Sequence, residues 1–106
     1  MTTYHFIAAS EAFLTEEEPL EEVLRERQRD YATKGKDIDF WLVRRPAFLE
    51  TPDLAAVAAP VPRPAAAVVS TDPTFITFMK LRLEFVARGS FEAPSDAISD
   101  PLASLS

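Results

Sequence analysis

The chain of 106 residues contains no cysteine, two glycines and one histidine, His5. Without cysteine it can form no disulfide, thiolate nucleophile, iron–sulfur cluster or cysteine-type zinc site. Gly35 and Gly89 stand alone, so neither a Walker loop nor a dinucleotide-binding fingerprint can be assembled. A Ser-His-Asp triad would need His5, and no nucleophile-elbow motif accompanies it. We therefore interpret His5 as a strand side chain that makes an ordinary hydrogen bond.

Metal-binding motifs and basic residues are also scarce. The carboxylate-rich stretch from Glu11 to Glu26 lacks the Glu-x-x-His pairs of a di-iron bundle, so we predict no metal and no cofactor. The 11 Lys and Arg residues face 17 Asp and Glu residues, which gives a net charge of −6. With no basic stripe to neutralise phosphates, we expect neither nucleic-acid binding nor docking on an anionic membrane surface.

Long hydrophobic runs are missing as well. A membrane-spanning helix needs about 20 apolar residues in succession, and no stretch approaches that length. We therefore expect a soluble protein without direct membrane insertion. The first ten residues, MTTYHFIAAS, have neither the basic region of a secretory signal nor the Arg- and Ser-rich character of a transit peptide.

What the chain does contain favours one α+β domain over residues 1–106. The composition is 47% hydrophobic and 26% charged, which is typical of an ordered globular protein. We predict a four-stranded, mostly antiparallel sheet from residues 2–9, 37–44, 65–70 and a short edge strand at 90–93. Two main helices, at about 19–34 and 73–88, and short helices should pack on it. The tail from 94 to 106 should be largely irregular.

The helix predicted at 73–88 has the clearest signals in the chain. Asp72 suits the N-cap, Pro73 suits the first helical position, and Gly89 suits the stop. At 100° per residue, one arc of this helix collects its apolar side chains, namely Phe75, Ile76, Phe78, Met79, Leu83, Phe85 and Val86.

Arg82 interrupts this apolar arc, and its guanidinium cannot lose its charge to escape burial. It must pair with a carboxylate, reach water, or lie on a face that another protein covers. Asp39 is the one acid within the apolar strand DIDFWLVR, so we expect Asp39 and Arg82 to lie near each other. A simpler alternative places Asp39 at the mouth of the strand in water. Aromatic residues beside an arginine are typical of binding hot spots, so Asp39, Phe40 and Arg82 are the candidate partner-binding residues.

Six blocks of sequence, in order, resemble a known family over nearly the whole chain. They are TEEEPLEEVLRERQRDY, DIDFWLV, RPAFLE, PAAAVVSTD, FITFMKLRLEFV and FEAPSDAISDPLASL. The chain thereby resembles the small accessory proteins of the magnesium-protoporphyrin IX monomethyl ester oxidative cyclase of cyanobacteria and plastids. Residues 51–63 are the part least like the family.

The resemblance implies a non-catalytic subunit that supports assembly, stability or activity of the membrane-bound di-iron catalytic subunit. That enzyme forms the fifth ring of protochlorophyllide in chlorophyll biosynthesis. The implied location is the cytoplasm or plastid stroma, at the thylakoid surface through the cyclase. A homodimer and contacts with other chlorophyll-biosynthesis enzymes are left open. Two alternatives remain: a tetrapyrrole carrier that serves the cyclase, and a regulatory homodimer without cyclase contact.

Overall fold

A four-stranded antiparallel sheet in the order β2-β3-β1-β4 organises the computed structural model, which describes residues 1–105. Its strands are β1 (Thr2–Ser10), β2 (Phe40–Arg44), β3 (Ala65–Ser70) and β4 (Ala87–Ala93). The longer helices are α1 (Leu20–Lys34) and α3 (Pro73–Leu83). The short helical elements are η1 (Phe13–Glu17), η2 (Ala47–Glu50), η3 (Pro52–Leu54) and α2 (Ala55–Ala58).

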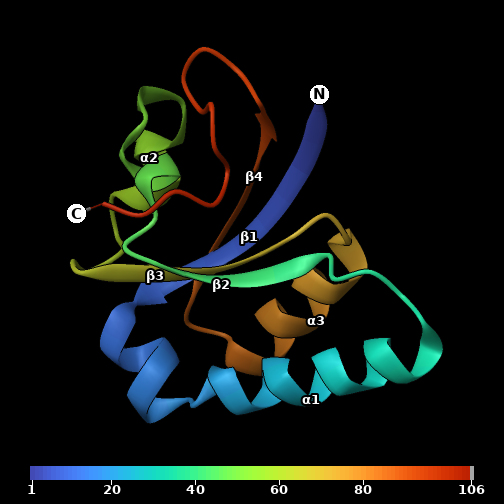
Figure 1. The fold of residues 1–106 in the computed structure, drawn as a ribbon. Coiled ribbons are helices and arrows are strands. Elements are labelled where there is room, and N and C mark those ends of the chain that lie inside the picture. Colours follow the sequence, from blue (N-terminus) through green and yellow to red (C-terminus); the bar gives the residue numbers. More distant parts are fainter. Residues whose placement is uncertain (106) are drawn as a thin grey trace.

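The sheet divides the molecule into two apolar layers (Figure 1). On one face α1, α3 and η1 cover a cluster of buried side chains that includes Ile7, Leu24, Phe40, Phe75 and Met79. On the other face α2, its neighbouring turns and the C-terminal segment cover a second cluster, which includes Phe6, Val43, Phe48, Val69 and Phe91. Because both faces of the sheet are covered, the buried residues 6–9 of β1 and 65–69 of β3 are all apolar.

The small residues of β3 bring the layers close to the sheet. All six residues of the strand AAAVVS are buried. Ala67 lies opposite Ala8 of β1 and Val43 of β2 in the antiparallel ladders. These three side chains belong to the cluster that contains Phe48 and Phe91, and the two alanines leave room for the aromatic rings on that face.

The predicted α+β class, the four strands and the helix α1 are confirmed. Gly35 ends α1 in the left-handed conformation, with φ of 66°, as the sequence predicts. At the N-terminus of α1, Pro19 occupies the cap position and no side chain caps the helix. Thr15 lies in η1 and donates its hydroxyl to the Glu11 carbonyl at 2.7 Å.

The predicted end of the second main helix at residue 88 is wrong, because α3 stops at Leu83. Residues 87–93 form β4 and pair with seven residues of β1. Gly89 is therefore a strand residue, and an added Cβ there would lie 2.7 Å from Cζ of Phe6. Pairing with β1 outweighs the local helical pattern, and only glycine leaves room for the Phe6 ring.

Among the described residues, no helix combines the length and apolar character needed to cross a membrane. The residues after β4, from 94 to 105, form turns and one isolated bridge between Pro46 and Ser104. The prediction of a largely irregular tail is confirmed for these residues.

Candidate docking surface on α3

The outer side of α3 leaves large apolar side chains in solvent. Phe78 is 54% exposed, Leu81 is 75% exposed, and Phe85, which follows the helix, is 88% exposed. Leu81 and Arg82 follow Phe78 by three and four residues, so the three side chains lie on one side of the helix. Single exposed apolar residues are ordinary, whereas contiguous apolar surface indicates an interaction site. We call these four residues, Phe78, Leu81, Arg82 and Phe85, the α3 stripe.

A strained turn holds Phe85 outside the helix. Glu84 has φ of 57° and ψ of −66°, and the Phe85 amide donates to the Leu83 carbonyl at 2.6 Å. This γ-turn is rare for a residue that carries a side chain. Lys80 Nζ donates to the carbonyls of Glu84 at 2.6 Å and of Val86 at 2.8 Å, which fastens the turn to α3. Such strain occurs often at binding sites, and here it presents the Phe85 ring to solvent.

Arg82 reaches water from the middle of this stripe. It is exposed, and it lines a hollow of about 340 Å³ beside the acidic first turns of α1, where Glu18, Glu22 and Glu26 lie. Within residues 1–105 it makes no salt bridge. Its charge is therefore accommodated by solvent, and its guanidinium is free to contact another molecule.

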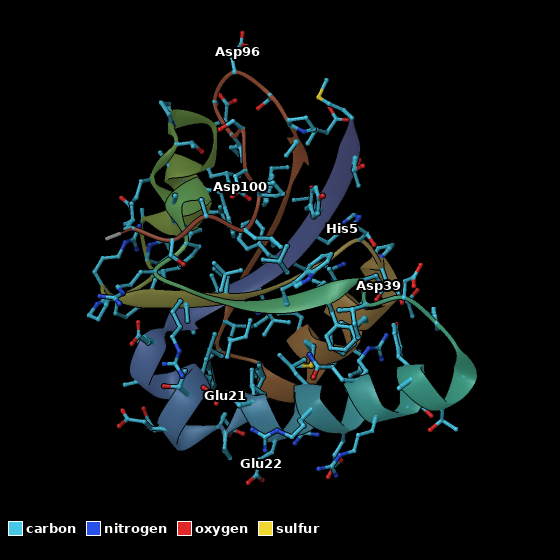
Figure 2. All side chains as sticks on the ribbon, in the orientation of Figure 1. His5, Glu21, Glu22, Asp39, Asp96 and Asp100 are labelled. Carbon is cyan, nitrogen blue, oxygen red and sulfur yellow. The ribbon has the colours of Figure 1, made fainter. Side chains whose placement is uncertain are left out.

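The expected proximity of Asp39 and Arg82 is not found. The Asp39 carbonyl accepts the Thr71 amide at 3.1 Å, just before α3 begins, whereas Arg82 lies in the last turn of that helix. Ten helical residues span about 15 Å. Figure 2 shows Asp39 beside the C-terminal half of α1 and Glu22, which lines the Arg82 hollow, on the N-terminal half.

Arg27 is the arginine that lies among aromatic rings. Its Cζ atom is 3.9 Å from the centre of the Phe75 ring, 5.0 Å from Tyr31 and 5.2 Å from Phe40. Its Nη2 donates to the Tyr31 hydroxyl at 2.8 Å, and that hydroxyl donates to Asp39 Oδ1 at 2.9 Å. Asp39 thus helps to hold Arg27 by way of Tyr31. The sequence carries a signal for this role, because Arg27 continues the helical spacing of Leu20, Val23, Leu24 and Tyr31.

Phe40 belongs to the core in this conformation. It is 1% exposed, and its ring meets Tyr31 edge-on with 5.2 Å between ring centres. The Phe40 ring therefore packs against the Arg27 guanidinium and presents no side-chain surface to a partner. Of the three candidate residues, Arg82 lies in solvent, Asp39 is partly buried and Phe40 is buried. Their role in partner binding stays a prediction.

A groove opens beside Phe85 at the end of the α3 stripe. Its volume is about 580 Å³. Mainly apolar residues line it, and they come from β1, η1, the proline-rich segment 60–62 and the turn before β4. Phe13, Val61 and Phe85 supply its larger apolar side chains, and Lys80 and Glu84 supply charge. The stripe and the groove therefore form one continuous candidate surface.

Outside this surface, the described residues bring together no three histidine, aspartate or glutamate side chains that could hold a metal ion. His5 is half-buried on β1, between Ser70 of β3 and Ser90 of β4. It does not line the groove beside Phe85.

These features define a small α+β protein whose distinctive surface is an apolar helix side with one arginine. The chain belongs to the Ycf54 family: the family model described as Ycf54 protein matches residues 2–93.

Its relatives come from cyanobacteria, red algae and plants. The chain is 60% identical to the Ycf54-like protein of Synechocystis sp., over 99% of this chain and 79% of that protein. It is 47% identical to the chloroplastic protein YCF54 of Arabidopsis thaliana, over 89% of this chain and 44% of that protein.

Solved structures share the whole fold. The A9G mutant of Ycf54 from Synechocystis sp. superposes with a TM-score of 0.97 at 58% identity, and all of both chains is covered. The All0216 protein of Nostoc sp. gives a TM-score of 0.94 at 56% identity, over 99% of this chain and 97% of that one. The four-stranded sheet with its helices is therefore the fold of the family.

Proposed function

We propose that this protein is a non-catalytic accessory subunit of the aerobic magnesium-protoporphyrin IX monomethyl ester cyclase. In this role it binds the membrane-bound di-iron catalytic subunit and supports its assembly or activity. Formation of the fifth ring of protochlorophyllide then depends on both this protein and the catalytic subunit. The resemblance of six sequence blocks to the cyclase accessory proteins motivates the choice of partner.

The α3 stripe is the observation that supports docking. Phe78, Leu81 and Phe85 offer apolar area to a partner, and Arg82 adds a cation that can form a bidentate contact with a carboxylate. Aromatic side chains and arginine are enriched where binding energy concentrates. The strained turn at Glu84 fixes Phe85 in advance, which lowers the ordering cost of binding.

Asp39 and Phe40 contribute to the same docking in a different way. Both contact the Tyr31–Arg27 unit that joins α1 to the start of α3. We propose that they position α3 against α1, whereas Arg82 contacts the partner. Loss of Asp39 or Phe40 should therefore weaken binding together with stability, whereas loss of Arg82 should weaken binding alone.

Recovery of the cyclase from solubilised membranes tests this function. Tagged wild-type protein should recover the catalytic subunit, and Arg82→Ala should recover less while its unfolding curve is unchanged. Asp39→Ala combined with Phe40→Ala should also recover less. Arg29→Ala is the matched control, because Arg29 is an exposed arginine on α1 outside the α3 stripe. If wild-type protein and Arg82→Ala recover equal amounts, Arg82 is not in the interface. If the wild type recovers none, the proposed function is wrong.

The groove beside Phe85 is the one observation that favours a second function, a tetrapyrrole carrier for the cyclase. Its lining is mainly apolar, and Glu17 and Glu84 at its rim could coordinate the magnesium of a porphyrin. Titration with the magnesium porphyrin ester should then shift the pigment's absorption, and Phe85→Ser should weaken the shift. Absence of any shift would exclude the carrier role.

The proposed location follows from the partner. The protein would lie in the cytoplasm or plastid stroma and attach to thylakoid membranes through the cyclase, without inserting into the bilayer. Other enzymes of chlorophyll biosynthesis would join the same assembly. Fractionation tests this location, since membrane-bound protein should fall when the catalytic subunit is removed.

A further inference from the structure

Strand β2 leaves one edge of the sheet without a partner in the described structure. Its odd-numbered residues bond to β3, as the Thr71 amide bonds to the Asp39 carbonyl and the Arg45 amide to the Ala65 carbonyl. The amides and carbonyls of Phe40, Leu42 and Arg44 must then point away from β3, because the two sides of a strand alternate. Within residues 1–105 these outward groups make no backbone hydrogen bond.

The two edges of the sheet differ in how they are protected. At the β4 edge, Arg88, Ser90 and Glu92 are exposed, and polar or charged side chains discourage added strands. Strand β2 reads FWLVR, with Trp41 and Leu42 half-buried on opposite faces of the sheet. An apolar edge strand with unpaired backbone groups is a template for pairing with another chain.

A groove follows this edge between β2 and α1. Its volume is about 340 Å³, and α1 lines it with Glu21, Leu24, Arg25 and Gln28. Glu21 is paired with Arg44, whereas the Arg25 side chain makes no hydrogen bond or salt bridge in the described chain. The groove therefore combines unpaired backbone groups with one uncompensated cation.

From these observations we infer that the β2 edge binds an extended segment of a partner protein as a fifth strand. The side chains of the segment that face α1 lie over Glu21, Arg25 and Gln28, so that side is polar and carries a carboxylate for Arg25. Side chains on the other face lie beside Trp41, which packs against the apolar cluster of that face, and are apolar. Main-chain bonds supply affinity and alternate side chains supply specificity, as in other β-augmentation sites. This inference does not depend on the proposed cyclase role.

A second copy of this chain fits the edge less well than a single segment does. Figure 1 shows α1 running alongside β2, and α1 side chains form one wall of the groove. If two β2 strands paired, their α1 helices would meet in the same space, because adjacent strands lie about 4.8 Å apart and packed helices need 8–10 Å. One extended segment avoids this collision.

Selection from a phage-displayed library of random peptides, each about ten residues long, tests the inference on the full chain. That length exceeds an average strand of about 5–6 residues. Leu42→Pro removes an outward amide and breaks no bond to β3, although it also removes the Leu42 side chain from the α1 face of the sheet, and it should weaken the selected peptides roughly tenfold. Arg25→Glu should weaken them severalfold and keeps the backbone intact. Arg29→Glu, a charge reversal on α1 outside the groove, should leave their affinity unchanged.

Amide hydrogen exchange of the wild type supplies a readout that needs no variant. Bound peptide should protect the amides of Leu42 and Arg44, which are not buried, and leave Trp41 and Val43, which already bond to β3, nearly unchanged. Failure to enrich any binder, or peptides that bind Leu42→Pro equally well, would overturn the inference. Protection of the same amides at high protein concentration without peptide would replace it with self-association.

Discussion

The guanidinium of Arg27 lies 3.9 Å from the centre of the Phe75 ring, which joins the middle of α1 to the first turns of α3. Tyr31 and Phe40 complete an aromatic cage around it, and Asp72 Oδ2 lies 3.7 Å from its Nη2. A cation enclosed by rings gains from the ring quadrupoles as well as from contact area. A partly buried charged residue, whose side chain is 28% exposed, therefore helps to hold α1 and α3 together on this face of the sheet.

Arg27→Ala should lower the free energy of unfolding by about 2 kcal/mol, because it removes the cation–π contacts and the packing of the arginine stem. Arg27→Lys should lose much of the same stability, since a lysine cannot stack a planar guanidinium on Phe75. Urea denaturation measures both variants. Arg29→Ala, exposed on the same helix, should change stability by less than about 0.5 kcal/mol. Equal denaturation midpoints for Arg27→Ala and Arg29→Ala would contradict the role assigned to Arg27.

The elements that the sequence predicts well are those set by local signals. The aromatic and branched residues of a short, largely apolar run indicate β1, and Gly35 ends α1 through its left-handed conformation. The end of α3 depends instead on pairing between residues 87–93 and β1, which are far apart in the sequence. The apolar pattern continues at helical spacing to residue 88, so it does not show that residues 87 and 88 pair with β1 instead of extending the helix.

The wrong end of the predicted helix also affects the surroundings predicted for Arg82. Extending the helix to residue 88 adds Phe85 to the apolar arc that contains Phe78 and Arg82, although all three residues are exposed. Two of the three aromatic neighbours of Arg27, Phe40 and Phe75, come from β2 and α3, so periodicity along α1 cannot identify them. Arg82 is therefore an unusual residue in the sequence, but the aromatic and acidic surroundings predicted for it belong to Arg27.

Gly89→Ala should destabilise the protein by about 1–3 kcal/mol, since the new methyl group must displace the Phe6 ring. Thermal unfolding measures the loss. Phe6→Leu alone should also destabilise, but the double variant should be more stable than the sum of the two single effects predicts. Strict additivity of the two changes would show that Gly89 is not fixed by contact with Phe6.

Leu81→Ser should leave stability within about 0.5 kcal/mol of the wild type, because Leu81 is 75% exposed. If the α3 stripe binds the catalytic subunit, the same variant should recover severalfold less of it from solubilised membranes. Thr33→Ser on α1, also at an exposed position, serves as the control for handling and expression. Full recovery by a folded Leu81→Ser variant would remove Leu81 from the docking surface.

Glu84→Gly should raise the free energy of unfolding by about 0.5–1 kcal/mol. Glycine adopts the positive φ of this turn without the steric cost that glutamate bears, and this gain exceeds the entropy that glycine adds to the unfolded chain. Glu84→Ala keeps the Cβ atom and should give no such gain, so the pair separates relief of strain from loss of charge. The same glycine should loosen the turn that presents Phe85 and so reduce cyclase recovery despite the added stability. A Glu84→Gly protein that is less stable than Glu84→Ala would show that the γ-turn stores no strain.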